Sequence, residues 1–319
     1  AILITAFVCS MMFILSIVGA STIIPRKAGD VKMGIASGRG NHTTSMVYWT
    51  MINPQARKGD VPIGVLAHRF PEAKLTPYPS TEEAEALVVC GGDGTLRRAL
   101  NLPLPKDLYY LPCGTVNDRG HLPQGPLTVG STQLGRFGYV FAWGTLTDIG
   151  YNTRRSAKRH WGRLAYLAKA VGAFRVRRLQ ATLTAGGITQ SGEYTLLMLL
   201  VGRRCFGFDF VKDEREDGAY LLTVSAPRSK GLGGLLTLFG RYARVFLLHI
   251  PPGYRRHGIC LLPVERAHIT LEHPVPWCVD GDKLITDVVR FERTPLPVNL
   301  HILPRKQKSP RPKDKGISE

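Results

Sequence analysis

Short runs of consecutive apolar residues, each closed by a turn rich in glycine, proline or polar residues, follow Ser45. Met46–Ile52, Leu87–Cys90 and Leu108–Leu111 have the length and the branched or aromatic side chains of buried strands. Each run leads into a loop that could open a helix, which is typical of an open, mostly parallel sheet. We therefore expect an α/β domain over residues 46–125.

The pattern changes to β after residue 125. One amphipathic helix is expected over Trp161–Phe174, where apolar residues recur at spacings of three and four. Otherwise the apolar runs have the length of strands, and the candidates are Tyr139–Trp143, Tyr194–Val201 and Tyr220–Val224. The sequence thus predicts a β-rich, sandwich-like second domain over residues 126–290. We expect its end, about residues 280–302, to return towards the first domain.

The two ends of the chain differ from the rest. Residues 1–24 carry no charge over a length that could cross a bilayer, and a basic flank follows in the linker 25–45. We interpret them as a signal anchor of a membrane-associated protein whose downstream part lies on the cytoplasmic side. The alternative is a cleaved segment leading to the secretory pathway or an organelle, since Asn41–Thr43 is a glycosylation sequon. Residues 303–319, with six basic residues and three prolines, predict a disordered basic tail.

The charge balance points to anionic partners. Lys and Arg outnumber Asp and Glu by 42 to 24, giving a net charge of +18. Tyr151 to Gly192 holds nine basic residues and no acid, which favours an anionic membrane surface. We expect no nucleic acid partner, because the basic segment lacks interleaved aromatic residues and a reading motif. The six cysteines form no C-x-x-C pair, so neither a zinc site nor a disulfide framework is indicated.

A glycine-rich turn follows the second apolar run. In Gly91-Gly92-Asp93-Gly94-Thr95 the glycines let backbone N–H groups approach phosphate oxygens, and Thr95 can cap a helix whose positive end faces the same ligand. Asp93 would repel a phosphate unless it binds magnesium or takes a proton, so it indicates phosphoryl transfer. The alternative is an ordinary glycine turn with an exposed aspartate.

A second turn of the same kind follows the third apolar run. It contains Gly114, Thr115, Asn117 and Asp118, with Thr and Asp at capping-box spacing. Two such loops at adjacent strand ends would face one crevice, which is where ligands bind in open α/β sheets.

These motifs together resemble a known family. GGDGT and PCGTVND, preceded by Asn53-Pro54 and followed by Asp280-Gly281-Asp282, are similar in order and spacing to the lipid kinases that include diacylglycerol kinases and sphingosine kinases. The resemblance covers about residues 47 to 290. It implies an ATP- and Mg²⁺-dependent lipid kinase with diacylglycerol as the first choice of substrate. A sphingoid-base kinase, or a degenerate member that only binds lipid or nucleotide, is the alternative, and a homodimer is left open.

The resemblance also implies roles for particular residues. The proton acceptor is Asp282 by comparison with bacterial diacylglycerol kinases, or Asp93 by comparison with sphingosine kinases. Asp148 would hold the lipid head group. Asp217 would bind a structural magnesium ion together with the backbone carbonyls of Glu214 and Ala219. The residues implied to contact ATP are Asn53, Gly91, Gly92, Asp93, Gly94, Thr95, Gly114, Thr115, Asn117, Asp118, Asp280 and Gly281.

Some residues depart from the family pattern. Arg98 stands where family members usually have an acidic residue. Arg97 and Arg98 are predicted to place two positive charges in the first turn of a helix, at a cost of about 0.3–1 kcal/mol each unless a phosphate lies nearby. Asp282 replaces a longer glutamate. The Gly and Pro residues after Asp118 interrupt the helix expected there.

Overall fold

A computed structural model describes most of the chain between residues 46 and 303. The described residues are 46–53, 63–113, 124–144, 177–205, 208–213, 215, 217–229 and 231–303. The apolar segment 1–24, the linker 25–45, the helix predicted over 161–174 and the tail from residue 304 therefore lie outside the described residues.

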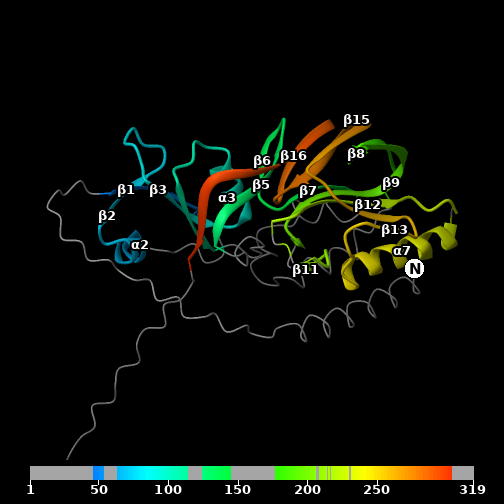
Figure 1. The fold of residues 1–319 in the computed structure, drawn as a ribbon, viewed down its shortest axis with the longest axis horizontal. Coiled ribbons are helices and arrows are strands. Elements are labelled where there is room, and N and C mark those ends of the chain that lie inside the picture. Colours follow the sequence, from blue (N-terminus) through cyan, green and yellow to red (C-terminus); the bar gives the residue numbers. More distant parts are fainter. Residues whose placement is uncertain are drawn as a thin grey trace, which may run out of the picture.

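Four parallel strands form one end of the sheet. Their order is β2 (Ala73–Pro77), β1 (Met46–Ile52), β3 (Ala86–Gly91) and β4 (Asp107–Pro112), and every neighbouring pair runs parallel. The three apolar runs predicted as strands correspond to β1, β3 and β4. Helix α2 (Ile63–Arg69) precedes β2, and helix α3 (Asp93–Leu100) connects β3 to β4 (Figure 1).

The remaining strands are antiparallel, apart from the end of β16. They are β5 (Gly125–Thr132), β6 (Gly135–Phe137), β7 (Val140–Gly144), β8 (Leu179–Ala185), β9 (Ile188–Val201), β10 (Arg204–Cys205), β11 (Phe208–Asp209), β12 (Ala219–Ser225), β13 (Tyr254–Arg256), β14 (Ile259–Pro263), β15 (Arg266–Val279) and β16 (Asp282–Ile302). The strands predicted over 139–143, 194–201 and 220–224 correspond to β7, β9 and β12. β16 pairs with β15 first and then lies parallel to β4 through Asn299–Ile302, so a single strand links the two parts of the sheet.

The β-rich part differs from the predicted sandwich-like arrangement. β9 pairs with β8 through its first half and with β7 through its second half. β15 runs in the same direction as β9, pairing with β8 through Ala267–Leu271 and with β7 at Cys278 and Val279. β7, β9, β8 and β15 therefore form a closed ring of pairings, and the side chains of Phe141, Leu197 and Trp277 fill one core cluster that this ring contributes to. The length of β9 and β15, 14 residues each, allows one strand to belong to both halves of the ring.

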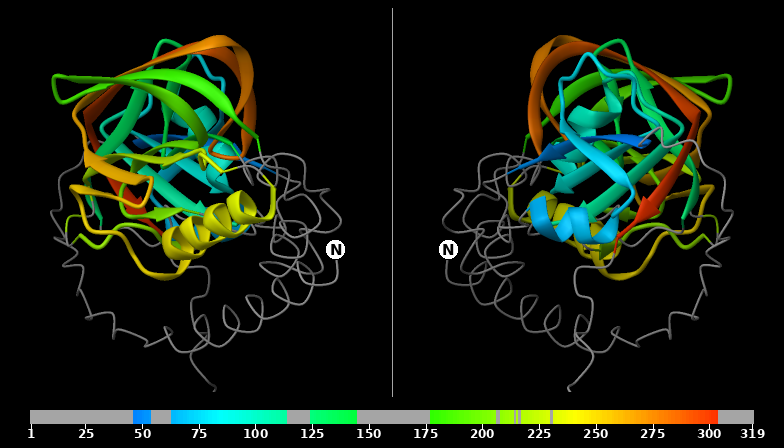
Figure 2. Two further views of the ribbon diagram at one scale, coloured as in Figure 1. Left: turned by 90° about the vertical axis from the view of Figure 1, so that its right-hand side faces the viewer. Right: turned by 90° about the vertical axis from the view of Figure 1, so that its left-hand side faces the viewer.

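A long helix covers a second core cluster. Helix α7 (Gly231–Leu247) lies along one side of the strands (Figure 2) and buries Leu238, Tyr242 and Val245 against β9, β12 and β14. Among the helices that the structure describes, none is long and apolar enough to cross a membrane.

Candidate functional site

The carboxyl ends of β1, β3 and β4 lie side by side. The backbone N–H of Asn53, just past β1, donates to the carbonyl of Cys90 at 2.9 Å, and that of Cys113, just past β4, donates to the carbonyl of Gly91 at 2.7 Å. These bonds extend the parallel ladder to the point where each strand turns. The edge formed in this way is the one where ligands bind in open α/β sheets.

Gly91 and Thr95 pack directly against each other at this edge. A Cβ atom added at Gly91 would overlap the Thr95 side chain, so only glycine fits there. The Asn53 side chain donates from Nδ2 to Thr95 Oγ1 at 3.2 Å. The prediction that Thr95 caps the helix is wrong, because α3 begins at Asp93. Its N-cap is Gly92, which has no side chain to make a capping hydrogen bond.

Asp93 is buried, in contrast to the exposed aspartate of the alternative interpretation. It opens α3 with 6% of its surface exposed, and the Tyr110 hydroxyl donates to its Oδ1 at 3.2 Å. The same hydroxyl lies 3.3 Å from the carbonyl oxygen of Gly91. Tyr110, which lies on β4, thus holds both the glycine turn and the Asp93 carboxylate. No sequence signal indicated this role, since a tyrosine within an apolar run reads as core.

The hairpin between β15 and β16 closes in a tight turn. Asp280 and Gly281 have φ angles of 49° and 91°, the left-handed conformation that a two-residue turn of type I′ requires. The Asp280 carboxylate is 3% exposed and accepts N–H groups of Gly138, Tyr139 and Val140, the latter two at 3.0 Å. Asp280 thereby fixes the turn against the start of β7. Contact of Asp280 and Gly281 with ATP stays a prediction.

This hairpin turn brings Asp282 to α3. A Cβ atom added at Gly94 would lie 3.7 Å from the carbonyl oxygen of Asp280 and 3.9 Å from Asp282 Oδ1. Arg97 Nη1 donates to Asp282 Oδ2 at 3.0 Å. Segments 185 positions apart in the chain therefore meet beside the glycine turn.

The position of Arg97 and Arg98 corrects another expectation. α3 has only eight residues, so both arginines lie in its last turn. Positive charge is favourable at a helix C-terminus, and the predicted cost in the first turn does not arise. Arg97 holds a carboxylate of the candidate site, although the sequence presented it only as a departure from a family pattern.

The surroundings of Asp217 do not fit the predicted magnesium site. The Arg293 guanidinium donates to both the carboxylate and the backbone carbonyl of Asp217, the latter at 2.9 Å. The carbonyl of Ala219 accepts the N–H of Val264 at 2.9 Å. A cationic side chain thus already balances the charge of this carboxylate. Glu214 lies outside the described residues.

Other predicted site residues also fall outside the described part of the chain. They are Gly114, Thr115, Asn117, Asp118 and Asp148. Within the described ranges, no group of three or more His, Cys, Asp or Glu side chains is arranged to hold a metal ion.

The comparisons with known proteins point in one direction. No family model matches the chain. Curated diacylglycerol kinases match about half of the chain. The diacylglycerol kinases of Staphylococcus carnosus and of Staphylococcus aureus strain JH9 are each 29% identical to it over 185 residues. Each match covers about 50% of this chain and about 60% of the relative.

Solved structures extend the likeness to the fold. A candidate diacylglycerol kinase from Bacillus anthracis superposes with a TM-score of 0.62 at 18% identity, over 84% of this chain and 98% of that one. A second structure, of a diacylglycerol kinase from the same organism, gives 0.57 at 17% identity, over 82% and 97%. The chain resembles diacylglycerol kinases in sequence and in fold. The chain spans about 60% of the length of the curated relatives that it matches.

Proposed function

We propose that this protein is an ATP- and Mg²⁺-dependent lipid kinase that transfers the γ-phosphoryl group to the hydroxyl of diacylglycerol. The observation that carries the proposal is the meeting of the glycine turn at the start of α3 with the hairpin that bears Asp282. A phosphate-binding element and a carboxylate are thereby brought to the same strand ends, and the relatives are named diacylglycerol kinases.

The ATP phosphates would bind at the start of α3. The first backbone N–H groups of a helix have no partner within the helix, and its dipole places positive charge there. Gly92 contributes no side-chain cap that would compete for these groups. Asn53 and Thr95, already joined by a hydrogen bond, line the same edge and present polar atoms to the nucleotide.

Magnesium would come with the nucleotide. Mg²⁺ keeps several waters and binds through one or two carboxylates and the substrate's phosphates, and it supplies charge neutralisation on the transferred phosphoryl group. Among the described residues, Asp93 and Asp282 are two carboxylates near the glycine turn that offer the hard oxygen ligands it prefers.

Asp282 is the better placed of the two carboxylates to accept the proton of the lipid hydroxyl. Its side chain is 38% exposed and therefore reachable, whereas Asp93 is 6% exposed and accepts the Tyr110 hydroxyl. Arg97 fixes the Asp282 carboxylate through one of its oxygens. In the reaction the O–H bond of the lipid breaks, Asp282 takes the proton, the lipid oxygen bonds to the γ-phosphorus, and ADP leaves.

The substrate's location implies action at a membrane. The hydroxyl of diacylglycerol lies at the headgroup boundary, so the enzyme must dock on the bilayer. We infer an anionic leaflet from the net charge of +18 and from the acid-free basic segment between Tyr151 and Gly192. Asp148, expected to hold the lipid head group, stays a prediction.

A phosphoryl-transfer assay tests the proposal. The full chain is incubated with γ-labelled ATP, Mg²⁺ and separate mixed micelles of diacylglycerol, sphingosine and monoacylglycerol, and labelled lipid is separated by chromatography. We expect label in phosphatidic acid. Label only in a sphingoid base would change the substrate assignment. ATP binding by calorimetry without label in any lipid would mean that the protein is a degenerate, non-catalytic relative.

A further inference from the structure

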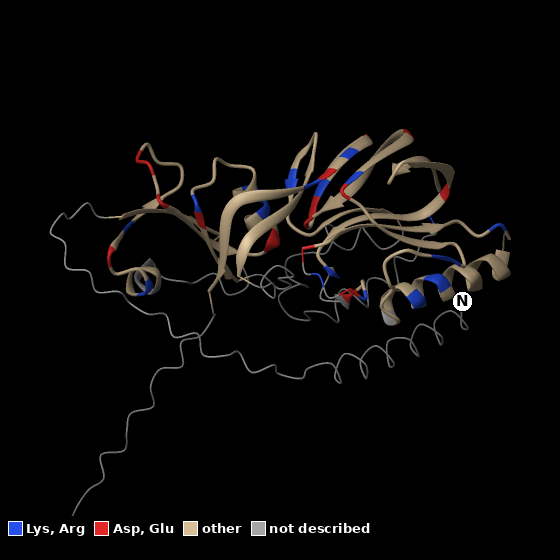
Figure 3. Cartoon of the chain, in the orientation of Figure 1, with Lys and Arg blue, Asp and Glu red and all other residues tan. Residues whose placement is uncertain are grey.

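One long stretch of the chain carries positive charge without any acid. From Gly218 to Val264 the sequence holds six Lys or Arg residues and no Asp or Glu. Helix α7 and the hairpin of β13 and β14 lie within it, and α7 shows only basic charge (Figure 3). A solvated helix face usually interleaves both signs, so this surface is unusual for one that meets only water.

The outer face of α7 exposes large apolar side chains. Leu232 and Leu236 are 69% and 60% exposed, although Leu238, Tyr242 and Val245 already anchor the helix in the core. Residues four apart share one side of a helix, so Leu232, Leu236, Gly240 and Arg244 form a single row along α7. The row is apolar at its start and cationic towards its end. Packing within the described protein does not account for the leucines.

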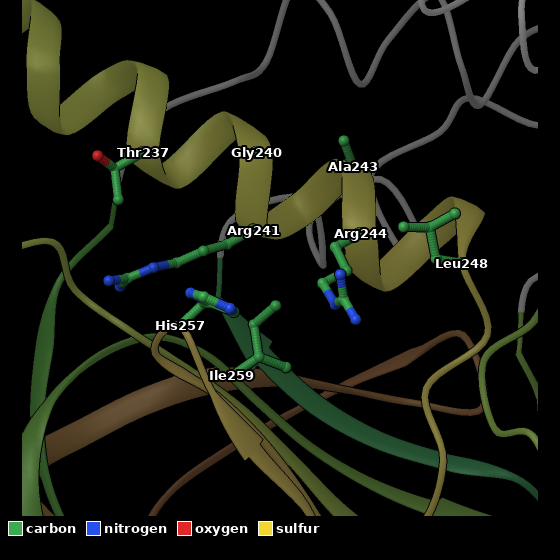
Figure 4. Close-up of a pocket in the computed structure, with 8 residues that line it drawn as sticks. All are labelled: Thr237, Gly240, Arg241, Ala243, Arg244, Leu248, His257 and Ile259. Carbon is green, nitrogen blue, oxygen red and sulfur yellow. The ribbon is translucent and has the colours of Figure 1, made fainter.

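The cationic part of this row borders a cavity of about 510 Å³. Arg241 and Arg244 extend from α7 on either side of His257, which lies at the turn of the β13–β14 hairpin (Figure 4). No acidic side chain lines the cavity, and neither arginine pairs with a carboxylate among the described residues.

The two arginines are held by uncharged groups. Arg241 donates to the carbonyl of Ser225 and packs over Gly258, while its buried Nε atom has no hydrogen-bond partner in the described protein. Arg244 lies over the Tyr254 ring, 5.0 Å from its centroid. Two guanidinium groups and an imidazole thus line one cavity without an acidic neighbour, and N–H donors of this kind suit phosphate groups.

We propose that α7 and the β13–β14 turn dock on a bilayer leaflet that contains anionic phospholipid. Leu232 and Leu236 enter the headgroup boundary, and Arg241, Arg244 and His257 bind phosphate groups of the lipids at the surface. Exposed leucines beside uncompensated arginines match the chemistry of such a leaflet, which is apolar below and anionic at its surface. The inference rests on the proposed function only for the expectation that the substrate is a membrane lipid.

A tryptophan probe tests the docking surface in the full chain. In Leu236→Trp, emission should shift to the blue on vesicles of phosphatidylcholine mixed with phosphatidylglycerol, and brominated phosphatidylcholine should quench it. Ile285→Trp is the matched control, because Ile285 is 62% exposed but lies on β16. Its emission should stay unchanged. Leu232→Trp is a second probe if the first variant misfolds by circular dichroism.

Removing the charges tests the phosphate site. Arg241→Gln with Arg244→Gln, in the Leu236→Trp background, should weaken vesicle partition about 30-fold at low salt, taking about fivefold for each basic residue. The difference should shrink as salt shortens the Debye length from about 8 Å to about 3 Å. Soluble glycerol phosphate at matched concentration should cause no blue shift, which separates a lipid surface from a free phosphate.

The outcomes separate this inference from the proposed function. Binding is measured without ATP, and transfer to diacylglycerol is measured separately in detergent micelles, where the arginine variants should keep full activity. No response of either tryptophan probe to vesicles, or an equal response to pure phosphatidylcholine, would overturn the docking surface even if the enzyme is active. A blue shift that depends on protein concentration alone would assign the face to a second copy of the chain instead.

Discussion

The pairing of Arg97 with Asp282 yields the sharpest prediction for the proposed reaction. Asp282→Asn keeps the size of the side chain and a hydrogen-bond acceptor but cannot take a proton. If Asp282 accepts the lipid proton, kcat should fall by about 100-fold or more, with little change in KM, because proton acceptance matters in the transition state rather than in binding. Arg97→Gln should act through the same carboxylate.

The size of the Arg97 effect follows from its geometry. At 3.0 Å, Coulomb's law gives about 1.4 kcal/mol at the dielectric constant of water and about 5.5 kcal/mol at an effective value of about 20. Since the Asp282 side chain is 38% exposed, solvent screening places the coupling near the lower figure, about 1 kcal/mol. Any loss of kcat in Arg97→Gln should come from lost positioning of the carboxylate and not from the charge itself, and it should be no more than about fivefold.

A double-mutant cycle measures this coupling. Both single variants, the double variant and the control Arg98→Gln are assayed with diacylglycerol in micelles, and Arg98 is suitable because it is exposed on the same helix turn. Arg97→Gln should have little further effect once Asp282 is Asn, and Arg98→Gln should match wild type. Wild-type kcat in Asp282→Asn would transfer the base role to Asp93. Equal costs of Arg97→Gln in both backgrounds would refute positioning through Asp282.

Three further predictions concern the stability of the folded protein. Asp93→Asn should abolish phosphoryl transfer and also lower the free energy of unfolding by about 1–2 kcal/mol, because the buried carboxylate accepts a hydrogen bond from the Tyr110 hydroxyl. Unchanged stability in chemical denaturation would contradict this. EDTA should leave the melting temperature of the nucleotide-free protein unchanged, because Arg293 and not a metal ion is the partner of Asp217. Arg293→Gln should lower the free energy of unfolding by about 1 kcal/mol through loss of its bonds to Asp217. A melting temperature that falls on chelation would contradict this assignment. Burial raises the pKa of the Cys90 thiol from its ordinary value of 9.0 to about 12, so above about pH 9 the folded state keeps a proton that the unfolded state loses. The free energy of unfolding should therefore fall by up to about 1.4 kcal/mol per pH unit above about pH 9. Cys90→Ala should remove that part of the slope in pH-dependent denaturation.

The sequence by itself determined the local elements. Apolar runs with branched and aromatic side chains become β1, β3 and β4 because such residues pack well in a buried strand. The glycine turn lies at the end of β3 because Gly91 leaves space for Thr95. Asp280 and Gly281 form a hairpin turn because both must adopt positive φ angles. Each of these depends on a few neighbouring residues, so each can be read from the pattern.

Only the tertiary structure decided which of these elements meet. Asp282 reaches α3 because Asp280 ties the hairpin turn to the backbone of Gly138, Tyr139 and Val140, more than a hundred residues earlier. The environment of the buried Asp93 depends on Tyr110 in β4, and the negative charge of Asp217 is balanced by Arg293 in β16. Such contacts arise from strand order and register, which periodicity does not encode. The same holds for the ring of β7, β9, β8 and β15, because pairing between distant strands is set by the closure of the whole sheet.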